Sequence, residues 1–507
     1  MEDGKSDKSI IIIGAGFAGL AAGIYARLNG YDAQIFELHD KPGGLCTSWD
    51  RKGYTIDGCI HWLVGSSPAS MIHDFWQEVG VAQGREFVNS DEFMEVEGPE
   101  GRKVVFYSNV DRLEKHLIEF SPADTKAIKE FTRGIRICRA FDLPSQNLPL
   151  PEKILKQIRL VFTFIWHGAK IKRWLKLTCA DFAAKFSDPL LRKAIEEMWL
   201  PEFSIFFVLA TFAYLTDRNA GYPVGGSLPM SKALEDRFKV LGGKIHYSKR
   251  VTKIITDNNR ATGISLEDGS EHRASRVISC ADGYSTIFRM LGGKYIDDKI
   301  RGIYDKWPVF PPLIFIGLGV NRVFNEIPAI VSGISYQLKV PLQIGDRIHE
   351  RLAVKIFNHD PSMAPAGKTA MITMLETSYD YWKELAGDRK AYLKKKDEIA
   401  EKIIEALDQR FQGISSLIEM IDVATPMTFE RYTGNWKGSF EGWLITPGNS
   451  EVLLKPMEQT LPGLNNFYMC GQWVEPGGGL PTSIMSARRL VKKLCGEDHL
   501  KFRTTFV

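Results

Sequence analysis

The sequence lacks any long uncharged apolar run. A membrane-spanning helix needs about 20 predominantly apolar residues. The most apolar early stretch, Ile11–Glu37, contains five glycines by Gly30 and is interrupted by Arg27. A signal peptide is not expected either, because the opening MEDGKSDK is mixed in charge and no clear small-residue cleavage site follows. We therefore expect no membrane-spanning helix, no secretion and a cytoplasmic location.

Patterned cysteines and histidines are also absent. The seven cysteines are an odd number, spread along the chain without a C-x-x-C pair, which indicates a reducing cytosol and argues against a disulfide framework or a zinc site. The ten histidines show no H-E-x-x-H or similar spacing, so no metal site is expected. The net charge of +4 is modest and no nucleic-acid module is recognisable, which argues against a nucleic acid partner. The 507 residues suffice for a large core or two domains.

A glycine-rich turn is present where a nucleotide-binding unit needs one. Gly14, Gly16 and Gly19 form G-x-G-x-x-G between a short β-branched run, which predicts a buried strand, and an Ala-rich run, which predicts a helix. A second predicted strand, YDAQIFE, ends in Glu37, eighteen residues after Gly19. This is the order of a dinucleotide-binding βαβ unit. The glycines admit a pyrophosphate, the helix N-terminus offers free N–H groups, and Glu37 accepts hydrogen bonds from ribose hydroxyls.

Further glycine turns indicate which dinucleotide is bound. Gly43 and Gly44 follow the second strand; a dehydrogenase that binds only NAD does not require them, although they also fit a simple turn. Far downstream, FYMCGQWVEPGGGLPTS predicts a strand, a second anion-binding turn and a helix N-terminus. Two such turns at opposite ends of the chain suit one long ligand bound across a domain, and FAD is such a ligand. No second G-x-G-x-x-G is present for NAD(P)H.

These blocks, in their order, resemble the FAD-dependent phytoene desaturase family, which includes carotenoid isomerases and retinol saturases and lies within the FAD amine-oxidase-like superfamily. The resemblance covers essentially the whole chain and rests on GAGFAGL with Glu37, Gly43-Gly44, YPVGG, HDPSMAPAGKTAMI, TPMTFERYTGNWKGSFEG and CGQWVEPGGGLPTSIMSA. Leu45 departs from it, because the family has arginine after the two glycines. The stretch GCIHWLVG is also more polar and aromatic than is usual in a desaturase. Both departures point away from a plain phytoene desaturase.

The resemblance implies an α/β fold in which a Rossmann-like FAD-binding domain of the GR2 type carries an inserted α+β substrate domain. We expect the FAD-binding domain to comprise residues 1–75, 220–300 and 440–507, and the substrate domain to comprise residues 76–219 and 301–439. The strand near Val251 is expected to lie against the adenine. The predicted cofactor-binding residues are Gly14, Ala15, Gly16, Ala18, Gly19, Glu37, Leu38, Gly43, Gly44, Leu45, Gly58, His61, Val251, Gly471, Glu475, Leu480, Pro481 and Thr482.

Two stretches of the predicted substrate domain suit a lipophilic small-molecule substrate. Residues 202–215 predict an apolar helix, which is either part of the core or a wall of an apolar tunnel. Residues 153–176 carry seven Lys or Arg and no acid, more than the net charge of the whole chain. On a helix, one face of that stretch gathers Ile154, Leu155, Ile158, Val161, Phe162, Ile165 and Trp166. This pattern is typical of peripheral membrane contact; the alternative is that the apolar face packs on the protein.

The implied activity is redox chemistry on a carbon–carbon bond of a polyene or related isoprenoid lipid. Desaturase, saturase and isomerase all stay open, as do the exact substrate, the electron donor or acceptor and the oligomeric state. His61, after the second glycine loop, and Glu475, before the last, are candidate proton-transfer residues. The alternatives are a structural histidine and an acid favoured by a helix dipole.

Two other functions remain to be weighed against this one. The first is an amine-oxidase-like flavoenzyme that oxidises a C–N bond, and the second is a non-catalytic FAD-holding chaperone. Some amine oxidases bond a cysteine covalently to the flavin, but Cys470, in the strand before the last turn, is poorly placed for that linkage.

Overall fold

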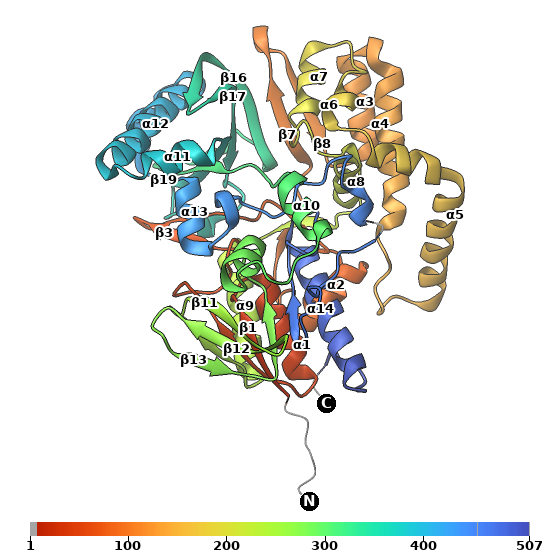
Figure 1. Cartoon of the computed structure of the whole chain (residues 1–507). Helices are drawn as coiled ribbons and strands as arrows, with labels where there is room; N and C mark the ends of the chain where they lie inside the picture. The colour runs from red at the N-terminus through yellow and green to blue at the C-terminus, as the bar shows by residue number, and fades with distance from the viewer. Residues whose placement is uncertain (1–7, 454, 506–507) are drawn as a thin grey trace, which may run out of the picture.

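The computed structural model of the chain describes residues 8–453 and 455–505 (Figure 1). The first seven residues, which hold most of the mixed-charge stretch weighed against a signal peptide, lie outside the described residues. Within the described ranges, no helix is both long enough and apolar enough to cross a membrane.

A five-stranded parallel sheet lies in the lower part of the molecule in Figure 1. Its order is β10-β2-β1-β14-β20, and its strands are Lys244–His246, Asp32–Phe36, Ser9–Ile13, Arg276–Ser279 and Phe467–Met469. Successive side chains of a strand point to opposite faces. Ile10 and Ile12 of β1 therefore pack with helices, whereas Ile11 and Ile13 pack with a second, smaller sheet.

Three helices cover one face of the parallel sheet and three strands cover the other. Helices α1 (Phe17–Leu28), α9 (Ser227–Val240) and α14 (Leu480–Glu497) share one core. The opposite face packs on the antiparallel strands β11 (Val251–Asp257), β12 (Arg260–Leu266) and β13 (Glu271–Arg273). The strand, helix and strand predicted at the N-terminal end are thus present as β1, α1 and β2.

A seven-stranded mixed sheet forms the upper part of the molecule, in the order β19-β15-β18-β17-β16-β7-β8. Only β16 and β7 pair in parallel. Helices α11 (Tyr379–Leu385) and α12 (Arg389–Arg410) share a core with it. The strands are β7 (Glu92–Glu97), β8 (Lys103–Tyr107), β15 (Leu313–Val320), β16 (Ile330–Ile344), β17 (Arg347–Ile356), β18 (Thr369–Glu376) and β19 (Ile418–Ala424).

Short helices gather beside β7 and β8 around a separate core (Figure 1). The helix predicted over 202–215 is α8 (Ile205–Thr216), and the Ser204 hydroxyl at its N-cap accepts a hydrogen bond from the N–H of Phe206. Most of its side chains are buried in that core, but Phe206 and Phe207 are only partly buried. Its neighbours are α3 (Val110–Phe120), α4 (Thr125–Cys138), α6 (Cys179–Ala183) and α7 (Pro189–Glu196). The connecting elements are β3 (Ser48–Arg51), β4 (Tyr54–Asp57), β5 (Leu63–Val64), α2 (Met71–Val79), β6 (Phe87–Val88), β9 (Ala220–Pro223), α10 (Asp298–Lys306) and α13 (Pro426–Thr433).

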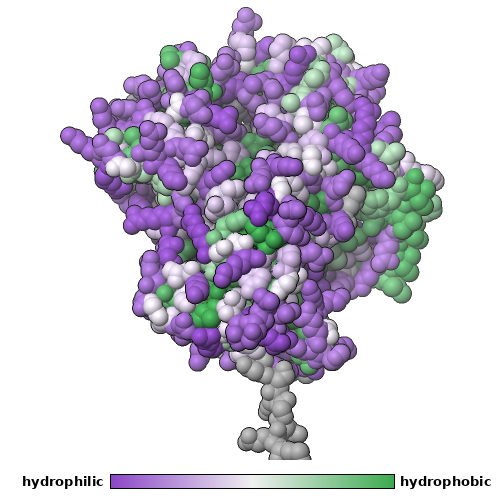
Figure 2. All heavy atoms as spheres, in the orientation of Figure 1, coloured by the Kyte–Doolittle hydropathy of each residue, from purple (hydrophilic) through white to green (hydrophobic). Residues whose placement is uncertain are grey.

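Helix α5 (Leu150–Leu175) lies at the edge of the molecule (Figure 1). Its C-terminal part is anchored by the buried side chains of Ile171, Trp174 and Leu175. Most apolar side chains before that anchor are exposed, and Trp166 reaches 71% exposure. They form the apolar area at the right of Figure 2: Leu150, Ile154, Leu155, Ile158, Val161, Phe162, Phe164, Ile165 and Trp166. The alternative that this face packs on the protein is therefore not observed within the described residues.

Candidate functional site

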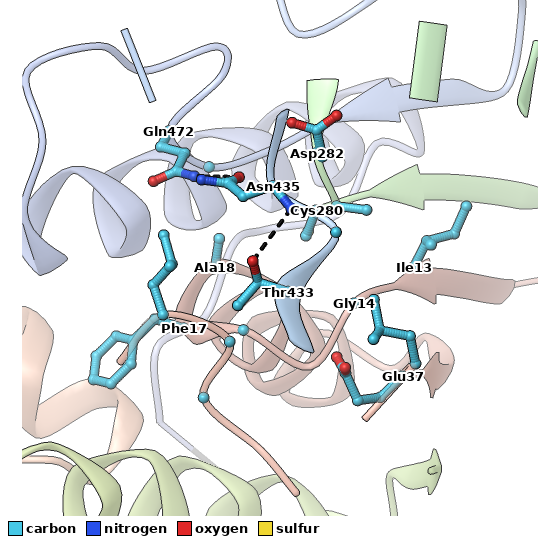
Figure 3. A pocket seen from close by; sticks show the side chains of 18 of the residues that line it. Ile13, Gly14, Phe17, Ala18, Glu37, Cys280, Asp282, Thr433, Asn435 and Gln472 are labelled. Carbon is cyan, nitrogen blue, oxygen red and sulfur yellow. Dashed lines mark hydrogen bonds between the residues drawn. The ribbon is translucent and has the colours of Figure 1, made fainter. Parts of the chain in front are cut away.

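An elongated pocket lies at the carboxyl ends of β1 and β14, beside the first turns of α1 and α14 (Figure 3). Ligands of open parallel sheets bind at this edge. Among the predicted cofactor-binding residues, the pocket is lined by Gly14, Gly16, Ala18, Glu37, Leu38, Gly43, Gly44, Leu45, Val251, Gly471 and Leu480. The predicted residues that do not line it are Ala15, Gly19, Gly58, His61, Glu475, Pro481 and Thr482. In the described part of the chain, no group of three or more His, Cys, Asp or Glu side chains is placed to hold a metal ion.

The two N-terminal glycine loops meet in the middle of the pocket. Gly14 adopts a φ of 98°, a conformation that favours glycine. A Cβ atom on Gly19 would collide with the carbonyl oxygen of Gly14, so helix α1 packs onto the turn only because residue 19 is glycine. The N–H of Gly43 donates to the carbonyl oxygen of Ala15 at 2.9 Å. Loops that the sequence shows as separate turns thus form one cradle at the N-terminus of α1.

Glu37 marks one end of the pocket. Its two carboxylate oxygens accept hydrogen bonds from the N–H groups of Ala15 at 2.6 Å and His39 at 2.8 Å. Burial raises the pKa of Glu37, and these backbone donors and Arg250 oppose that rise. Lys249 and Arg250 line the same end. The carboxylate therefore lies at the end of β2, where the sequence predicts a group that accepts hydrogen bonds from ribose.

The opposite end of the pocket is formed by the last glycine turn. Gly477, Gly478 and Gly479 all have positive φ, and α14 begins directly after them. The N–H of Gly479 donates to a carboxyl oxygen of Glu441 at 3.2 Å, and Glu441 itself lines the pocket. Glu441 keeps some accessible surface because it faces the pocket, yet burial raises its pKa to about 7.

Three polar groups that motif reasoning did not single out line the pocket (Figure 3). Asp282 follows β14 and accepts hydrogen bonds from the N–H groups of Ser285 at 2.7 Å and Trp436 at 2.8 Å. Burial raises the pKa of Asp282 to about 6. Asn435 accepts from the side-chain amide of Gln472 at 3.1 Å. Glu441 stands in the stretch TPMTFERYTGNWKGSFEG that carries the resemblance, and Asp282 stands in none of the quoted motifs. Nothing in the local sequence shows that either acid is buried at the pocket.

Asp57 connects a further glycine-containing loop with the YPVGG motif. Its buried carboxylate accepts hydrogen bonds from the N–H groups of Cys59 at 2.9 Å and Ser227 at 2.6 Å. It therefore connects residues 53–58, which read G-Y-T-I-D-G, to the end of the YPVGG motif. As a result Cys59, rather than its neighbour Gly58, lines the pocket.

His61 lies on a different surface, against the seven-stranded sheet. Its Nδ1 is 3.4 Å from the amine of Lys355 on β17. Lys355 is only 2% exposed. The amine also lies 4.9 Å from the ring centroids of Tyr222 and Phe357. Burial lowers the pKa of Lys355 to about 7, and burial together with Lys355 holds the pKa of His61 well below its usual value. Sequence reasoning missed Lys355 because one lysine in a strand carries no signal of its burial.

Glu475 is paired away from the pocket. Its carboxylate lies 2.7 Å from the guanidinium of Arg489 on α14. Burial raises the pKa of Glu475, and Arg489 opposes that rise. Its catalytic role stays a prediction, because the structure brings Glu441 rather than Glu475 to the pocket.

Aromatic side chains connect helix α5 with the last glycine turn. Phe164 of α5 contacts Phe141, with ring centroids 5.4 Å apart, and Phe141 contacts Phe206 at 5.6 Å. Phe206 contacts Phe207 at 5.9 Å. The ring of Phe207 would lie 3.7 Å from a Cβ atom on Gly477. An unbroken series of aromatic contacts therefore runs from the exposed helix to the glycine turn of the pocket.

Comparison with known proteins agrees with this geometry. The family model described as flavin containing amine oxidoreductase matches residues 17–495. The chloroplastic prolycopene isomerase of Arabidopsis thaliana is 25% identical over 502 residues, covering 94% of this chain and 81% of the relative. A lycopene-forming phytoene desaturase of a Paracoccus species is 23% identical over 508 residues, covering 95% and 96%.

A solved structure supports the fold independently. Cyclohexylamine oxidase from Brevibacterium oxydans matches with a TM-score of 0.60 at 13% identity, covering 97% of this chain and 100% of that one. At this identity the match speaks for the fold alone. It confirms the predicted α/β class with a Rossmann-like FAD-binding domain.

Proposed function

The chain belongs to the family of flavin-containing amine oxidoreductases, and from this premise we propose that it acts on a carbon–carbon bond of a polyene or related isoprenoid lipid. It is an FAD-dependent oxidoreductase. Relatives named prolycopene isomerase and phytoene desaturase, which align over almost the whole chain, support a polyene substrate.

The residues present fit FAD. Glu37 would hold the adenosine ribose, the Gly14–Gly19 turn and the N-terminus of α1 would hold the pyrophosphate, and the turn at 477–479 would face the flavin ring. FAD, when bound, supplies hydride transfer to or from a carbon atom. We assign residues 1–75, 220–300 and 440–507 to holding FAD, and residues 76–219 and 301–439 to the substrate.

The aromatic series between α5 and the glycine turn carries the proposal for the substrate. Phe164, Phe141, Phe206 and Phe207 offer a series of adjoining apolar rings. A polyene has no charged group to grip, so an apolar aromatic path recognises it through burial of its surface. A small amine does not need such a path.

Helix α5 supports a peripheral membrane contact. Its exposed apolar face is joined by Lys153, Lys156, Arg159, Lys170, Lys172 and Arg173, and such helices lie in the interface of anionic membranes. Because polyenes dissolve in the bilayer, we propose that α5 rests on the membrane and that the substrate enters beside it.

Lipid analysis tests the proposal. Cells that make phytoene, or that are fed retinol, would express the chain, with Gly14→Val as the matched variant that disrupts the cofactor turn. A loss of two mass units indicates a desaturase, a gain indicates a saturase such as a retinol saturase, and a changed retention time at constant mass indicates an isomerase. Unchanged lipids from cells that contain folded, yellow protein would contradict the polyene proposal.

Amine oxidation is the second candidate, favoured by the match to the family model of flavin containing amine oxidoreductases and by Phe440 and Trp473 in the lining of the pocket. Cys470 is buried and does not line the pocket, unlike Cys46, Cys59 and Cys280. Anaerobic bleaching of the flavin by a panel of amines, but not by a lipid extract, would establish this function instead.

A further inference from the structure

The arrangement of the lining residues shows which end of the pocket would face the flavin ring. This inference rests on the proposed function, in which the pocket binds FAD. Figure 3 shows Glu37 on one side of the turn that begins at Gly14 and Gln472 on the other. Arg250 belongs to the Glu37 side, because its charge acts on the Glu37 carboxylate. In FAD the pyrophosphate separates adenosine from flavin, so the remaining end faces the ring. That end is lined by Cys59, Phe440, Glu441, Trp473, Gly479 and Leu480.

Glu441 is the acid at this end. One of its carboxyl oxygens accepts the N–H of Gly479, and the other lies where a Cβ atom on Gly478 would be, so it fills the inner side of the glycine turn. Among the described residues, no lysine, arginine or histidine forms an ion pair with it. A buried carboxylate without a cation is costly, so the group changes its protonation state easily in response to other charges.

Few other titratable groups face Glu441. The Cys59 thiol approaches it from the loop after β4, and the hydrogen bond with Cys46, together with burial, raises the pKa of that thiol. Asp282, which follows β14, also lines the pocket, and its carboxylate is held by two N–H groups. Lys249 and Arg250 line the adenosine end instead. The carboxyl group is therefore the group at the flavin end whose charge responds most directly to a change in charge on the ligand.

We propose that Glu441 is the proton acceptor of the pocket, taking up one proton when bound FAD is reduced. Two-electron reduction of bound FAD with uptake of one proton would add one negative charge to the pocket that Glu441 lines. Repulsion between like charges at short range in a poorly hydrated pocket then favours the neutral carboxylic acid.

The step balances for a desaturation. The –CH2–CH2– unit of the substrate would give up a hydride, which bound FAD would accept, and a proton from the neighbouring carbon, and a C=C bond would form. The Glu441 carboxylate becomes the acid by taking that second proton, so the net charge of the pocket is unchanged. Two electrons and two protons leave the substrate, and no further oxidant is needed for this half of the reaction.

The midpoint potential of the bound flavin tests the proposal without any substrate. We would measure the potential between pH 5.5 and 9 for the wild type, Glu441→Gln, Glu441→Asp and Glu235→Gln, the last a buried acid of α9 that does not line the pocket. Above about pH 7 the wild type should take up two protons per two electrons, and Glu441→Gln should take up one, which halves the pH dependence. Glu441→Asp and Glu235→Gln should keep the wild-type slope. Equal slopes in the wild type and Glu441→Gln would overturn the proposal.

A second measurement covers the case in which Glu441→Gln fails to fold. Proton uptake by the weakly buffered wild-type holoenzyme on photochemical reduction, followed with an indicator dye at pH 8, should equal two per flavin. One proton per flavin would refute the role of Glu441. Neither measurement uses the lipid substrate. Inactivity toward polyenes would therefore contradict the proposed function without affecting the conclusion about proton uptake by Glu441.

Discussion

At the scale of single residues, Glu37 is already oriented by the protein itself. Its carboxylate is fixed by the N–H groups of Ala15 and His39, next to the cationic side chains of Lys249 and Arg250. A ligand that donates hydroxyl hydrogens to this carboxylate needs no rearrangement of the side chain. Such preorganisation lowers the cost of binding.

Glu37→Ala should weaken FAD binding by about 10-fold to 100-fold, since hydrogen bonds to a charged group contribute about 1.5–3 kcal/mol. Titration of apoprotein with FAD, followed by quenching of flavin fluorescence, measures this. Glu271→Ala, an exposed acid on β13, should bind FAD like the wild type. If Glu37→Ala also binds FAD like the wild type, Glu37 does not hold the ribose.

Lys355 should make stability depend on pH. Its pKa is about 7 in the folded protein against an ordinary 10.5, so the unfolded chain binds the proton more tightly. The resulting penalty is fully present below pH 7 and disappears as the pH rises toward 10.5. A difference of this size corresponds to roughly 5 kcal/mol as an upper limit.

Lys355→Met should therefore raise the free energy of unfolding at pH 6.5 by roughly 2–5 kcal/mol and change it far less at pH 9.5. Urea denaturation at the two pH values measures the effect, with the exposed Lys339→Met as the control. Equal effects at both pH values would show that the amine is not strained by burial. If turnover falls while stability rises, the amine and His61 act on the substrate rather than on the fold.

Sequence motifs identified the residues that act through their neighbours along the chain. Gly14, Gly19 and Glu37 act through a turn and its adjoining strands, so their spacing along the chain carries the information. Glu441 and Lys355 are defined by burial, and burial depends on strands and helices that lie far away in the sequence. Glu475 shows that a motif can also suggest a residue wrongly placed by its neighbours in the fold. Its carboxylate pairs with Arg489, fourteen positions later, and does not line the pocket.

At the scale of elements, helix α5 is attached to the protein by one part and exposes an apolar face on another. It is anchored by its last turns, while the apolar face of the preceding turns is exposed. Exposed apolar surface of this extent marks a contact site. The sequence predicted the helix and its amphipathic face, and the structure adds that the face is not covered by the described residues.

Replacing Phe162, Ile165 and Trp166 by serine should reduce binding to anionic liposomes by at least about 100-fold, because burying each such side chain contributes roughly 1.5–3 kcal/mol. Vesicle sedimentation measures binding. The matched control is Val340→Ser with Ile348→Ser, which removes exposed apolar side chains from β16 and β17. Wild-type sedimentation of the triple variant would rule out α5 as the membrane contact.

At the scale of the whole molecule, FAD should stabilise the fold as one unit. The pocket is lined by residues from Ile13 to Ser483, so a ligand that binds there bridges distant parts of the chain. At a free concentration 100 times its Kd, FAD should add about 2.7 kcal/mol to the free energy of unfolding. Denaturant titrations of apoprotein with and without FAD measure this, and coincident curves would contradict binding across the chain.

The order of the motifs indicated that the strands of the parallel sheet come from distant parts of the chain, because the two anion-binding turns stand at opposite ends of the sequence. The sequence did not indicate that β7 and β8 join β16 in the seven-stranded sheet. That pairing is parallel and joins strands more than 200 residues apart, so no hairpin signal marks it. Strand order over such distances depends on the packing of the assembled molecule.

The strand order of the parallel sheet also bears on synthesis of the protein. Strand β20, with α14 after it, is made last, and β14 has no outer neighbour until Phe467–Met469 arrives. A chain emerging from the ribosome therefore carries β1, β2 and α1 for more than 400 residues before the cofactor domain closes. During that interval its apolar strands are open to wrong pairing, which makes the nascent chain a client for chaperones and makes late truncations far more damaging than their length suggests.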